Sequence, residues 1–422
     1  MLLGLNVRGS VEHDSAAGSA ASALPSADLA GFRAIAGSAV CEHPGMSEAP
    51  ARADVVIIGG GAVGASTAFH LATGGVTDVV LLERETLASG STSRSAGGAR
   101  LQFADELNVA LSLRSLDEFE RWDALIGEHV AFVPEIAFHQ HGYLFLLDST
   151  EQLALFRAAI EVQHAQGVPS RELTPAEALA IVPQLELAGI LGATFCPRDG
   201  HMSPEAVVQG YAAAAVARGA QVLQGCPATG IEYADGRITG VRTGRGTIAT
   251  DTVVCAAGAW SREVGAMVGV DIPVHGEPRH MWFSPERGSL RPDLPLTIDF
   301  TTSFYFHAEG PGIVFGGREE ALEDVAEHAL ERLPLILDLP IQSSWWGYYE
   351  VSPDHNAIVG EVTAPGRFLY ATGFSGHGFQ QAPAIGEHLA QLIRREATTF
   401  DLGGLSVERF ARGEARAERF VV

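Results

Sequence analysis

Residues 54–64 of the sequence are Asp-Val-Val-Ile-Ile-Gly-Gly-Gly-Ala-Val-Gly, and Ala-Ser-Thr-Ala-Phe-His-Leu follows as residues 65–71. The apolar run before the glycines predicts a buried parallel strand, and the residues after them have a helical pattern. Gly59, Gly61 and Gly64 have the G-x-G-x-x-G spacing of a dinucleotide-binding turn. The first glycine permits the tight turn, the second lets a pyrophosphate approach the backbone, and the third lets helix and strand pack closely.

A second apolar run, residues 79–82, ends in Glu83 at the distance from the glycines that a dinucleotide site requires. A carboxylate at this position accepts hydrogen bonds from ribose hydroxyl groups and repels a 2′-phosphate, which favours FAD or NAD over NADP. An ordinary glycine-rich turn between strand and helix is the alternative. We expect the following residues to bind the dinucleotide: Gly59, Gly61, Ala62, Val63, Gly64, Glu83 and Arg84.

The composition is that of a globular enzyme. The 422 residues are 46% apolar and 19% charged, with a formal net charge of −23. This charge argues against nucleic acid and anionic membrane surfaces as partners. No apolar run reaches the roughly 20 residues of a membrane helix, so no membrane span is expected. All 28 basic residues are arginine, which excludes lysine-based mechanisms.

Four cysteines, Cys41, Cys196, Cys226 and Cys255, are far apart and form no C-x-x-C pair. They indicate buried thiols in a reducing compartment, and the first residues lack the pattern of a signal peptide. We therefore expect a cytoplasmic protein. Residues 1–51, rich in Ala, Ser and Gly, predict a disordered leader.

Residues 106–126 have the apolar spacing of one helix, and residues 130–138 and 143–147 have the pattern of strands. His139 and His141 lie two residues apart, on one face of the predicted strand. They could be two metal ligands, but no third ligand stands near them in the sequence. A surface or network pair of histidines is therefore favoured, and no metal site is expected.

Residues 271–350 contain several alternating segments that predict an antiparallel sheet. The fold class that these patterns predict is α/β (α+β), with a Rossmann-like nucleotide-binding domain and a second layer that has its own antiparallel sheet.

Two further strands of the predicted nucleotide domain end in small residues. The first runs into Cys255-Ala-Ala-Gly-Ala-Trp260, and the second into Gly373-Phe-Ser-Gly-His-Gly-Phe-Gln380, which a helix follows. Glycines at such ends allow close backbone approach, and a helix N-terminus aimed at a flavin stabilises the negative charge that forms on reduction. The alternative is a plain strand–helix unit.

Together these motifs, with the stretch Ser91-Thr-Ser-Arg-Ser-Ala-Gly-Gly-Ala-Arg100 and Tyr349-Glu-Val-Ser-Pro-Asp354, resemble the D-amino-acid-oxidase-like FAD superfamily. The sarcosine and dimethylglycine oxidase branch, including the sarcosine oxidase β-subunit, is especially similar. The resemblance implies a Rossmann-like FAD-binding domain interleaved with an antiparallel-sheet substrate domain. The expected divisions are a leader at 1–51, the FAD-binding domain at 52–128, 197–268 and 352–422, and the substrate domain at 129–196 and 269–351.

The resemblance also implies roles for single residues. Arg100 would bind a substrate carboxylate, Tyr305 and Tyr349 would line the substrate pocket, and His377 to Gln380 would lie along the flavin edge.

The resemblance extends the set of expected site residues. The added cofactor-binding residues are Ser91, Thr92, Ser93, Ala257, Gly258, Trp260, Gly376, His377, Gly378, Phe379 and Gln380. The expected catalytic residues are Arg100, Tyr305, Tyr349, His377 and Gln380.

Some positions depart from the family pattern. Relatives with covalent flavin attach it through a Cys where this chain has Gly347, or through a His where it has Arg94. The resemblance therefore implies non-covalent FAD. Lysines that serve oxygen reactivity and carboxylate binding in monomeric oxidases correspond to Val314 and Gln380, so O2 or an electron-carrier partner could accept the electrons.

The function expected is FAD-dependent oxidation of a small carboxylated amine, a secondary or tertiary N-alkyl amino acid, by hydride transfer to flavin and hydrolysis of the imine. Oxidation of a primary amino acid or a 2-hydroxy acid is the related alternative. A flavoprotein acting mainly as an assembly or interaction subunit is the alternative from another class.

Overall fold

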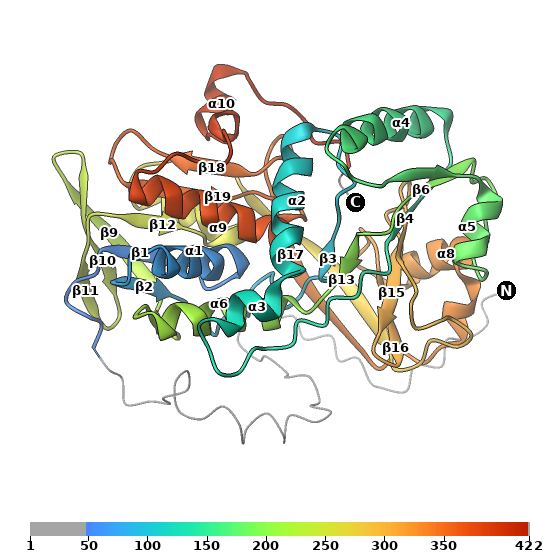
Figure 1. The fold of residues 1–422 in the computed structure, drawn as a ribbon, viewed down its shortest axis with the longest axis horizontal. Coiled ribbons are helices and arrows are strands. Elements are labelled where there is room, and N and C mark those ends of the chain that lie inside the picture. The colour runs from blue at the N-terminus through green and yellow to red at the C-terminus, as the bar shows by residue number, and fades with distance from the viewer. Residues whose placement is uncertain (1–47, 421–422) are drawn as a thin grey trace. The chain divides into compact units, whose positions relative to one another are not determined.

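The computed structural model describes residues 48–420. The predicted disordered leader, residues 1–51, lies outside the described residues up to position 47. Within the described part, two large sheets lie beside each other, each with its own helices (Figure 1). No helix among residues 48–420 is long and apolar enough to cross a bilayer.

The first sheet has six strands in the order β18-β19-β12-β1-β2-β8. Its pairs are parallel except for β18 with β19. The strands are β1 (Val55–Ile58), β2 (Val79–Leu82), β8 (Gln221–Leu223), β12 (Val253–Cys255), β18 (Ile358–Glu361) and β19 (Phe368–Thr372). β1 lies between β2 and β12 and is buried along its whole length, as the uninterrupted apolar run predicts.

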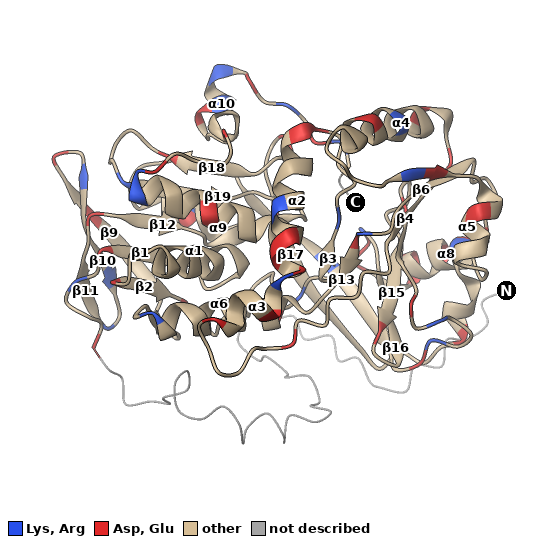
Figure 2. Cartoon of the chain, viewed as in Figure 1, with Lys and Arg blue, Asp and Glu red and all other residues tan. Residues whose placement is uncertain are grey.

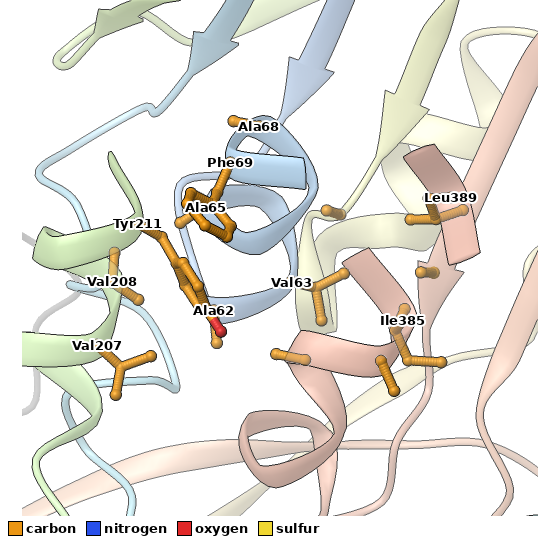
Figure 3. Packing of buried hydrophobic residues seen from close by; sticks show 14 of the residues in the cluster. Ala62, Val63, Ala65, Ala68, Phe69, Val207, Val208, Tyr211, Ile385 and Leu389 are labelled. Carbon is orange, nitrogen blue, oxygen red and sulfur yellow. The ribbon is translucent and has the colours of Figure 1, made fainter. Parts of the chain in front are cut away.

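Three helices pack on one another beside this sheet: α1 (Ala62–Thr73), α6 (Pro204–Ala217) and α9 (Gly378–Arg394). Figure 3 shows the small side chains of α1 between Val207, Val208 and Tyr211 of α6 and Ile385 and Leu389 of α9. The approach to α9 is close, because a Cβ on Gly386 would lie 2.2 Å from the Ser66 hydroxyl oxygen. Small residues on α1 thus let both neighbours reach it.

The second sheet has eight strands in the order β17-β13-β16-β15-β14-β4-β6-β5. All its pairs are antiparallel except β14 with β4. The strands are β4 (Tyr143–Leu147), β5 (Arg171–Leu173), β6 (Gly192–Cys196), β13 (His275–Ser284), β14 (Leu296–Asp299), β15 (Tyr305–Glu309), β16 (Gly312–Gly316) and β17 (Ser343–Val351). The associated helices are α4 (Thr150–Ala165), α5 (Pro175–Ile181) and α8 (Leu322–Arg332). The mixture of parallel and antiparallel sheets confirms the predicted fold class.

Smaller elements complete the fold. A three-stranded sheet contains β9 (Ala228–Ala234), β10 (Arg237–Thr243) and β11 (Gly246–Ala249), and a two-stranded one joins β3 (Gly98–Ala99) to β7 (Gly200–His201). The remaining helices are α2 (Glu106–Phe119), α3 (Trp122–Gly127), α7 (Ser261–Ala266) and α10 (Glu408–Arg412), and the short 3-10 helices are η2 (Gly258–Trp260), η3 (Pro334–Asp338) and η4 (Gly403–Leu405).

Two local predictions are wrong. Residues 130–138 form no strand, since the chain there is irregular and makes only a bridge from His139 to His201. Pro134 has no N–H for a strand ladder, and Val130, Val133 and Phe138 instead pack as a loop against the helical core. The single helix predicted for 106–126 is broken at Arg121 into α2 and α3.

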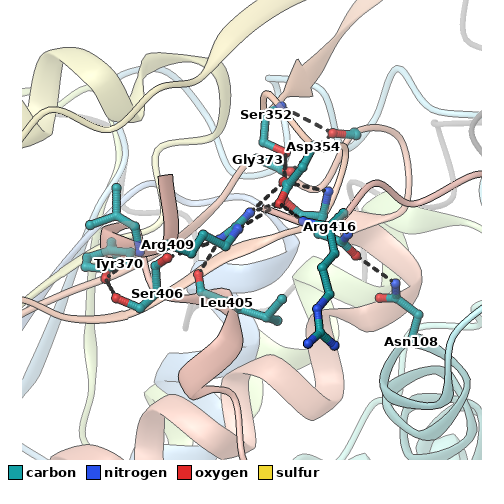
Figure 4. Close-up of polar contacts among 12 residues, drawn as sticks. Asn108, Ser352, Asp354, Tyr370, Gly373, Leu405, Ser406, Arg409 and Arg416 are labelled. Atoms are coloured by element: carbon teal, nitrogen blue, oxygen red, sulfur yellow. Dashed lines mark hydrogen bonds and ion pairs between the residues drawn. The ribbon is translucent and has the colours of Figure 1, made fainter. Parts of the chain in front are cut away.

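An ion pair holds α10 against the loop between β17 and β18, and further contacts hold the segment after α10. Arg409 donates from Nε and one terminal nitrogen to the two Asp354 oxygens, each at 2.8 Å, and both side chains are buried (Figure 4). Asp354 also accepts from the backbone N–H of Arg416. Farther along, the Phe420 ring stacks on Phe156 with centroids 4.1 Å apart. Glu418 and Phe420 are therefore buried and anchor the segment, whereas residues 413–417 and 419 are exposed.

Charged residues lie mostly on the outer elements. Asp and Glu number 51 against 28 Lys and Arg, and Figure 2 shows acidic residues on α2, α4 and α5. The surface is thus rich in negative charge.

Candidate active site

A cavity of about 770 Å³ is lined by residues of both large sheets. One wall is formed at the carboxyl ends of β1, β2 and β12, where open parallel sheets bind ligands. The opposite wall comes from the eight-stranded sheet and includes Met281, Leu296 and Ile298. We call these the nucleotide wall and the sheet wall.

The glycine loop of the nucleotide wall has three different constraints. Gly59 has φ +116°, and a Cβ there would lie 2.2 Å from the Ala256 carbonyl oxygen. A Cβ on Gly64 would lie 1.9 Å from the Gly59 carbonyl oxygen. At Gly61 the only atom within 4 Å of such a Cβ is the Thr92 hydroxyl oxygen, at 3.2 Å. Gly59 and Gly64 thus serve the fold, whereas Gly61 leaves space open toward the cavity.

The start of α1 also lies at the cavity. Ala62 and Val63 line it, and the helix has no side-chain N-cap among the described residues. The Ala62 N–H donates to the Thr92 hydroxyl oxygen at 3.2 Å. The positive end of the helix dipole still faces the cavity, where it favours an anion. Glu83, which also lines the cavity, accepts from the backbone N–H of Gly60 and of Glu85, each at 2.8 Å. Its carboxylate thereby braces the loop.

Most of the other predicted nucleotide residues also line the cavity. These are Arg84, Ser91, Thr92, Ala257, Gly258, Trp260, Gly376, Gly378, Phe379 and Gln380. The Arg84 guanidinium lies 3.8 Å from the centre of the Trp260 ring, which holds both side chains in place. Gly64 and Ser93 are not lining residues; Gly64 packs behind the loop and the Ser93 N–H donates to the Ala88 carbonyl.

His377, predicted to be catalytic, is buried and does not line the cavity. Its ring packs against Phe103, with centroids 5.4 Å apart, and its Nε2 has no partner within residues 48–420. Burial, followed by the nearby Arg100 charge, lowers the pKa of His377 to about 3. The structure therefore places a neutral imidazole behind the cavity wall.

Arg100 lines the cavity, but its terminal nitrogens are engaged. One donates to the Gln102 carbonyl and the other to the Phe420 carbonyl, each at 2.5 Å, and the side chain is buried over the Phe103 ring. Its backbone N–H donates to Gln380, another predicted residue. Burial lowers the pKa of the guanidinium, while Glu418 opposes the shift. Much of its hydrogen-bonding capacity thus holds the chain together.

The sheet wall carries an arginine that the sequence reasoning missed. Arg279 on β13 lines the cavity, and its guanidinium lies 4.8 Å from the Tyr349 ring centre. Its terminal nitrogens donate to Pro278 and Glu277, but its buried Nε has no partner among the described residues. The sequence did contain a signal for this residue: Arg279 is a positively charged side chain within a strand that borders the expected substrate pocket.

Three tyrosines line the same cavity. The predicted Tyr305 and Tyr349 both line the cavity, together with Tyr143, which was not predicted. Burial raises the pKa of all three hydroxyl groups, so each is a neutral donor at physiological pH. Gly376, at φ +99°, approaches Tyr349 so closely that a Cβ would lie 2.5 Å from its ring. This contact joins the α9 loop to the sheet wall.

Glu350 is a further residue that the sequence reasoning missed. It lines the cavity next to Tyr349 and accepts a hydrogen bond of 2.9 Å from the Thr372 hydroxyl. Burial raises the pKa of its carboxyl to about 7, although this hydrogen bond acts in the opposite direction. The cavity therefore contains a carboxyl group that changes charge near neutral pH.

The comparisons with known proteins agree with this geometry. The model of the family described as FAD dependent oxidoreductase (DAO) matches residues 54–392. Human mitochondrial sarcosine dehydrogenase is 31% identical over 389 residues, which cover 86% of this chain and 42% of that protein. The chain thus spans less than half the length of this relative.

Two solved structures have the same fold. L-proline dehydrogenase from P. horikoshii has a TM-score of 0.80 and 32% identity, covering 87% of this chain and all of that one. Glycine oxidase from Geobacillus kaustophilus has a TM-score of 0.77 and 26% identity, covering 85% and 99% of the two chains. The resemblance inferred from the sequence motifs is confirmed.

Proposed function

The chain belongs to the FAD dependent oxidoreductase family, and from this premise we propose that it oxidises a small secondary or tertiary amino acid. The observation that carries the proposal is the cavity itself. One wall presents a glycine turn and a helix N-terminus, and the other presents the Arg279 guanidinium beside the Tyr349 ring. The first suits a dinucleotide and the second suits a small carboxylate.

The residues of the nucleotide wall fit FAD. The open space beside Gly61 lets a pyrophosphate approach the loop, and the positive end of the α1 dipole favours its charge. When bound, FAD supplies a ring system that accepts the electrons of the substrate. We propose that it is held without a covalent bond. Where relatives carry an attaching Cys or His, this chain has Gly347 and Arg94, which are in close contact with each other.

The substrate carboxylate would bind at the sheet wall. The Arg279 guanidinium supplies positive charge there, and the neutral hydroxyl groups of Tyr349 and Tyr305 are donors beside it. A carboxylate on a fixed guanidinium orients the neighbouring C–H bond, which is the main requirement for transfer of a hydride. Arg100, the residue predicted from the sequence, would contribute its positive charge, and its direct contact with substrate remains a prediction.

The surroundings would favour this chemistry. The tyrosine rings exclude water, which strengthens the electrostatic interactions inside the cavity. The start of α9 at Gly378 points its positive end into the cavity, where it would stabilise negative charge. The imine product would then hydrolyse in water.

The test is an anaerobic substrate panel on the flavin-loaded protein, followed by admission of air. N-alkyl amino acids should bleach the flavin absorbance at about 450 nm, whereas the corresponding amines without a carboxylate should not. Return of the colour in air would identify O2 as acceptor, and its absence would favour an electron-carrier partner. Bleaching by 2-hydroxy acids or primary amino acids alone would contradict the proposed substrate class. No bleaching by any compound, with stable binding of another protein, would favour an assembly role instead.

A further inference from the structure

Four histidines and a glutamate gather outside the cavity, and none of them lines it. They are His201 on β7, His307 and Glu309 on β15, and His139 and His141 in the segment that leads into β4. The ring centroids of His201 and His307 are 4.2 Å apart, and those of His139 and His201 are 5.3 Å apart. The sequence showed only the adjacent pair, because His201 and His307 come from distant parts of the chain.

The two central histidines are buried and incompletely bonded. His201 is 3% exposed and His307 is 1% exposed, and the Nε2 atom of each has no hydrogen-bond partner among residues 48–420. Buried ring nitrogens of histidine are normally paired, so two unpaired ones side by side call for an additional ligand. The Nδ1 atom of half-buried His141 is a third unpartnered nitrogen in the same cluster.

The hydrogen bond of His307 determines which nitrogen is free to coordinate. Its Nδ1 lies 2.9 Å from the Ala308 carbonyl oxygen, which can only accept, so Nδ1 carries the proton. Nε2, which has no partner among the described residues, therefore carries the lone pair that can coordinate an ion. A metal-bound histidine is typically held in this way, with its second nitrogen donating to a carbonyl or carboxylate.

We propose that His201 Nε2, His307 Nε2 and the Glu309 carboxylate bind a divalent transition-metal ion such as Zn²⁺, with His139 and His141 beside the open coordination position. One ligand atom from each of the three residues lies within 4.8 Å of the others. Tetrahedral Zn²⁺ with bonds of about 2.0–2.1 Å needs ligand atoms roughly 3.4 Å apart. Rotation of the exposed Glu309 side chain supplies much of that adjustment.

The character of the ligands favours zinc over the alkaline-earth ions. Two neutral imidazoles and one carboxylate suit zinc and its neighbours, whereas Mg²⁺ and Ca²⁺ prefer oxygen ligands. Burial, followed by the charges of the other histidines, lowers the pKa of His201, and burial also lowers that of His307. Both rings are thus unprotonated at neutral pH and need lose no proton to bind the ion.

The position of the site gives the ion a structural role. His201 on β7 is paired with Gly98 on β3. Gly98 lies two residues before Arg100 in the chain. An ion between His201 and His307 would therefore tie this strand pair to β15 of the eight-stranded sheet. It would stabilise one edge of the cavity without touching a substrate.

The experiment uses the untagged, flavin-loaded full chain, stripped of metal with a chelator. Zn²⁺ binding is measured by competition with a fluorescent indicator, and metal content by mass spectrometry after dialysis. We expect one Zn²⁺ per chain, with affinity lowered at least about 100-fold in His307→Gln and at least about 10-fold in Glu309→Gln. Millimolar Mg²⁺ should not compete.

The matched control is His328→Gln, which removes a histidine paired with Glu319 at 3.2 Å on the outer helix α8 and should leave binding unchanged. No uptake of Zn²⁺ at micromolar concentration, or equal affinity in all variants, would overturn the proposal. If His307→Gln does not fold, Glu309→Gln decides the matter alone, because Glu309 is exposed and its replacement should preserve flavin content.

Discussion

The nucleotide wall and the sheet wall of the cavity are built on different principles. The nucleotide wall offers backbone: a glycine with open space beside it, a helix start, and a carboxylate that braces the loop. The sheet wall offers side chains, above all Arg279 and the tyrosines around it. The nucleotide wall would bind its ligand mainly through backbone groups. The sheet wall would bind its ligand mainly through charged and polar side chains.

Two arginines make the contrast specific. Both Arg100 and Arg279 line the cavity. The terminal nitrogens of Arg100 donate to the Gln102 and Phe420 carbonyl oxygens. Arg279, in contrast, has a buried Nε without a partner among the described residues. A charged residue in a pocket can therefore serve the fold or the ligand. The hydrogen bonds that it already makes indicate which.

The strongest test of the nucleotide wall is Gly61→Leu. The side chain would fill the open space beside the loop, so FAD affinity should fall roughly 100-fold or more, about 2.7 kcal/mol. The fold should remain, because Gly61 has an ordinary φ. Flavin content and circular dichroism measure the two effects. Gly244→Leu is the control, since a Cβ there has no neighbour within 4 Å; normal flavin content in Gly61→Leu would refute the assignment.

On the sheet wall, Arg279→Gln and Arg100→Gln should differ in kind. Loss of the Arg279 charge should lower kcat/KM by about 2–4 kcal/mol, roughly 30- to 1,000-fold, with little change in Tm. Arg100→Gln should chiefly lower stability, by about 1–3 kcal/mol for each carbonyl left without a donor. Steady-state kinetics and thermal unfolding separate the two. Arg262→Gln on the surface is the control, and the reverse pattern would restore Arg100 as the carboxylate ligand.

Glu350 should make the sheet wall sensitive to pH. Its pKa is about 7 in the folded chain against a usual value of 4.5. As pH rises from about 4.5 to 7, the unfolded chain loses this proton first, so stability falls by about 2–3 kcal/mol and then levels off. Glu350→Gln should lack this component. Urea unfolding of the flavin-free protein across that range measures it, and parallel curves for both proteins would contradict the expectation.

The smallest effect is expected where a side chain assists the nucleotide wall. Arg84→Ala removes the cation over the Trp260 ring, a contact of about 0.5–1 kcal/mol, so FAD affinity should fall only about two- to fivefold. Flavin titration of the apoprotein measures this. A loss as large as that in Gly61→Leu would mean that side chains, and not backbone, dominate this wall.

The sequence predicted the nucleotide wall well because glycine spacing is a local constraint. Gly59 has the positive φ and Gly64 the close backbone approach that the spacing requires, and Gly61 leaves space open toward the cavity. The strand predicted at residues 143–147 was likewise confirmed. Short-range chemistry determines these features.

The sheet wall was less predictable because its state depends on distant residues. Nothing near Arg100 in the sequence shows that the Phe420 carbonyl accepts its hydrogen bond, and nothing near Arg279 marks its free nitrogen. The histidine cluster is a similar case, since the sequence pair acquires His201 and His307 only through folding. Whether a polar group is satisfied is a property of tertiary structure.

The order of strands in the six-stranded sheet has a consequence for how the protein folds. β12 lies between β1 and β19, and Val253 pairs with Val56 on one side and Phe368 on the other. These pairing partners are far apart in the sequence. Such pairings give a high contact order. Chains of this kind fold slowly because long loops must close, at a cost in entropy, before the strand contacts contribute stability. Refolding should therefore be limited by assembly of this sheet, and riboflavin shortage during expression should expose the protein to aggregation at its unfinished strand edges.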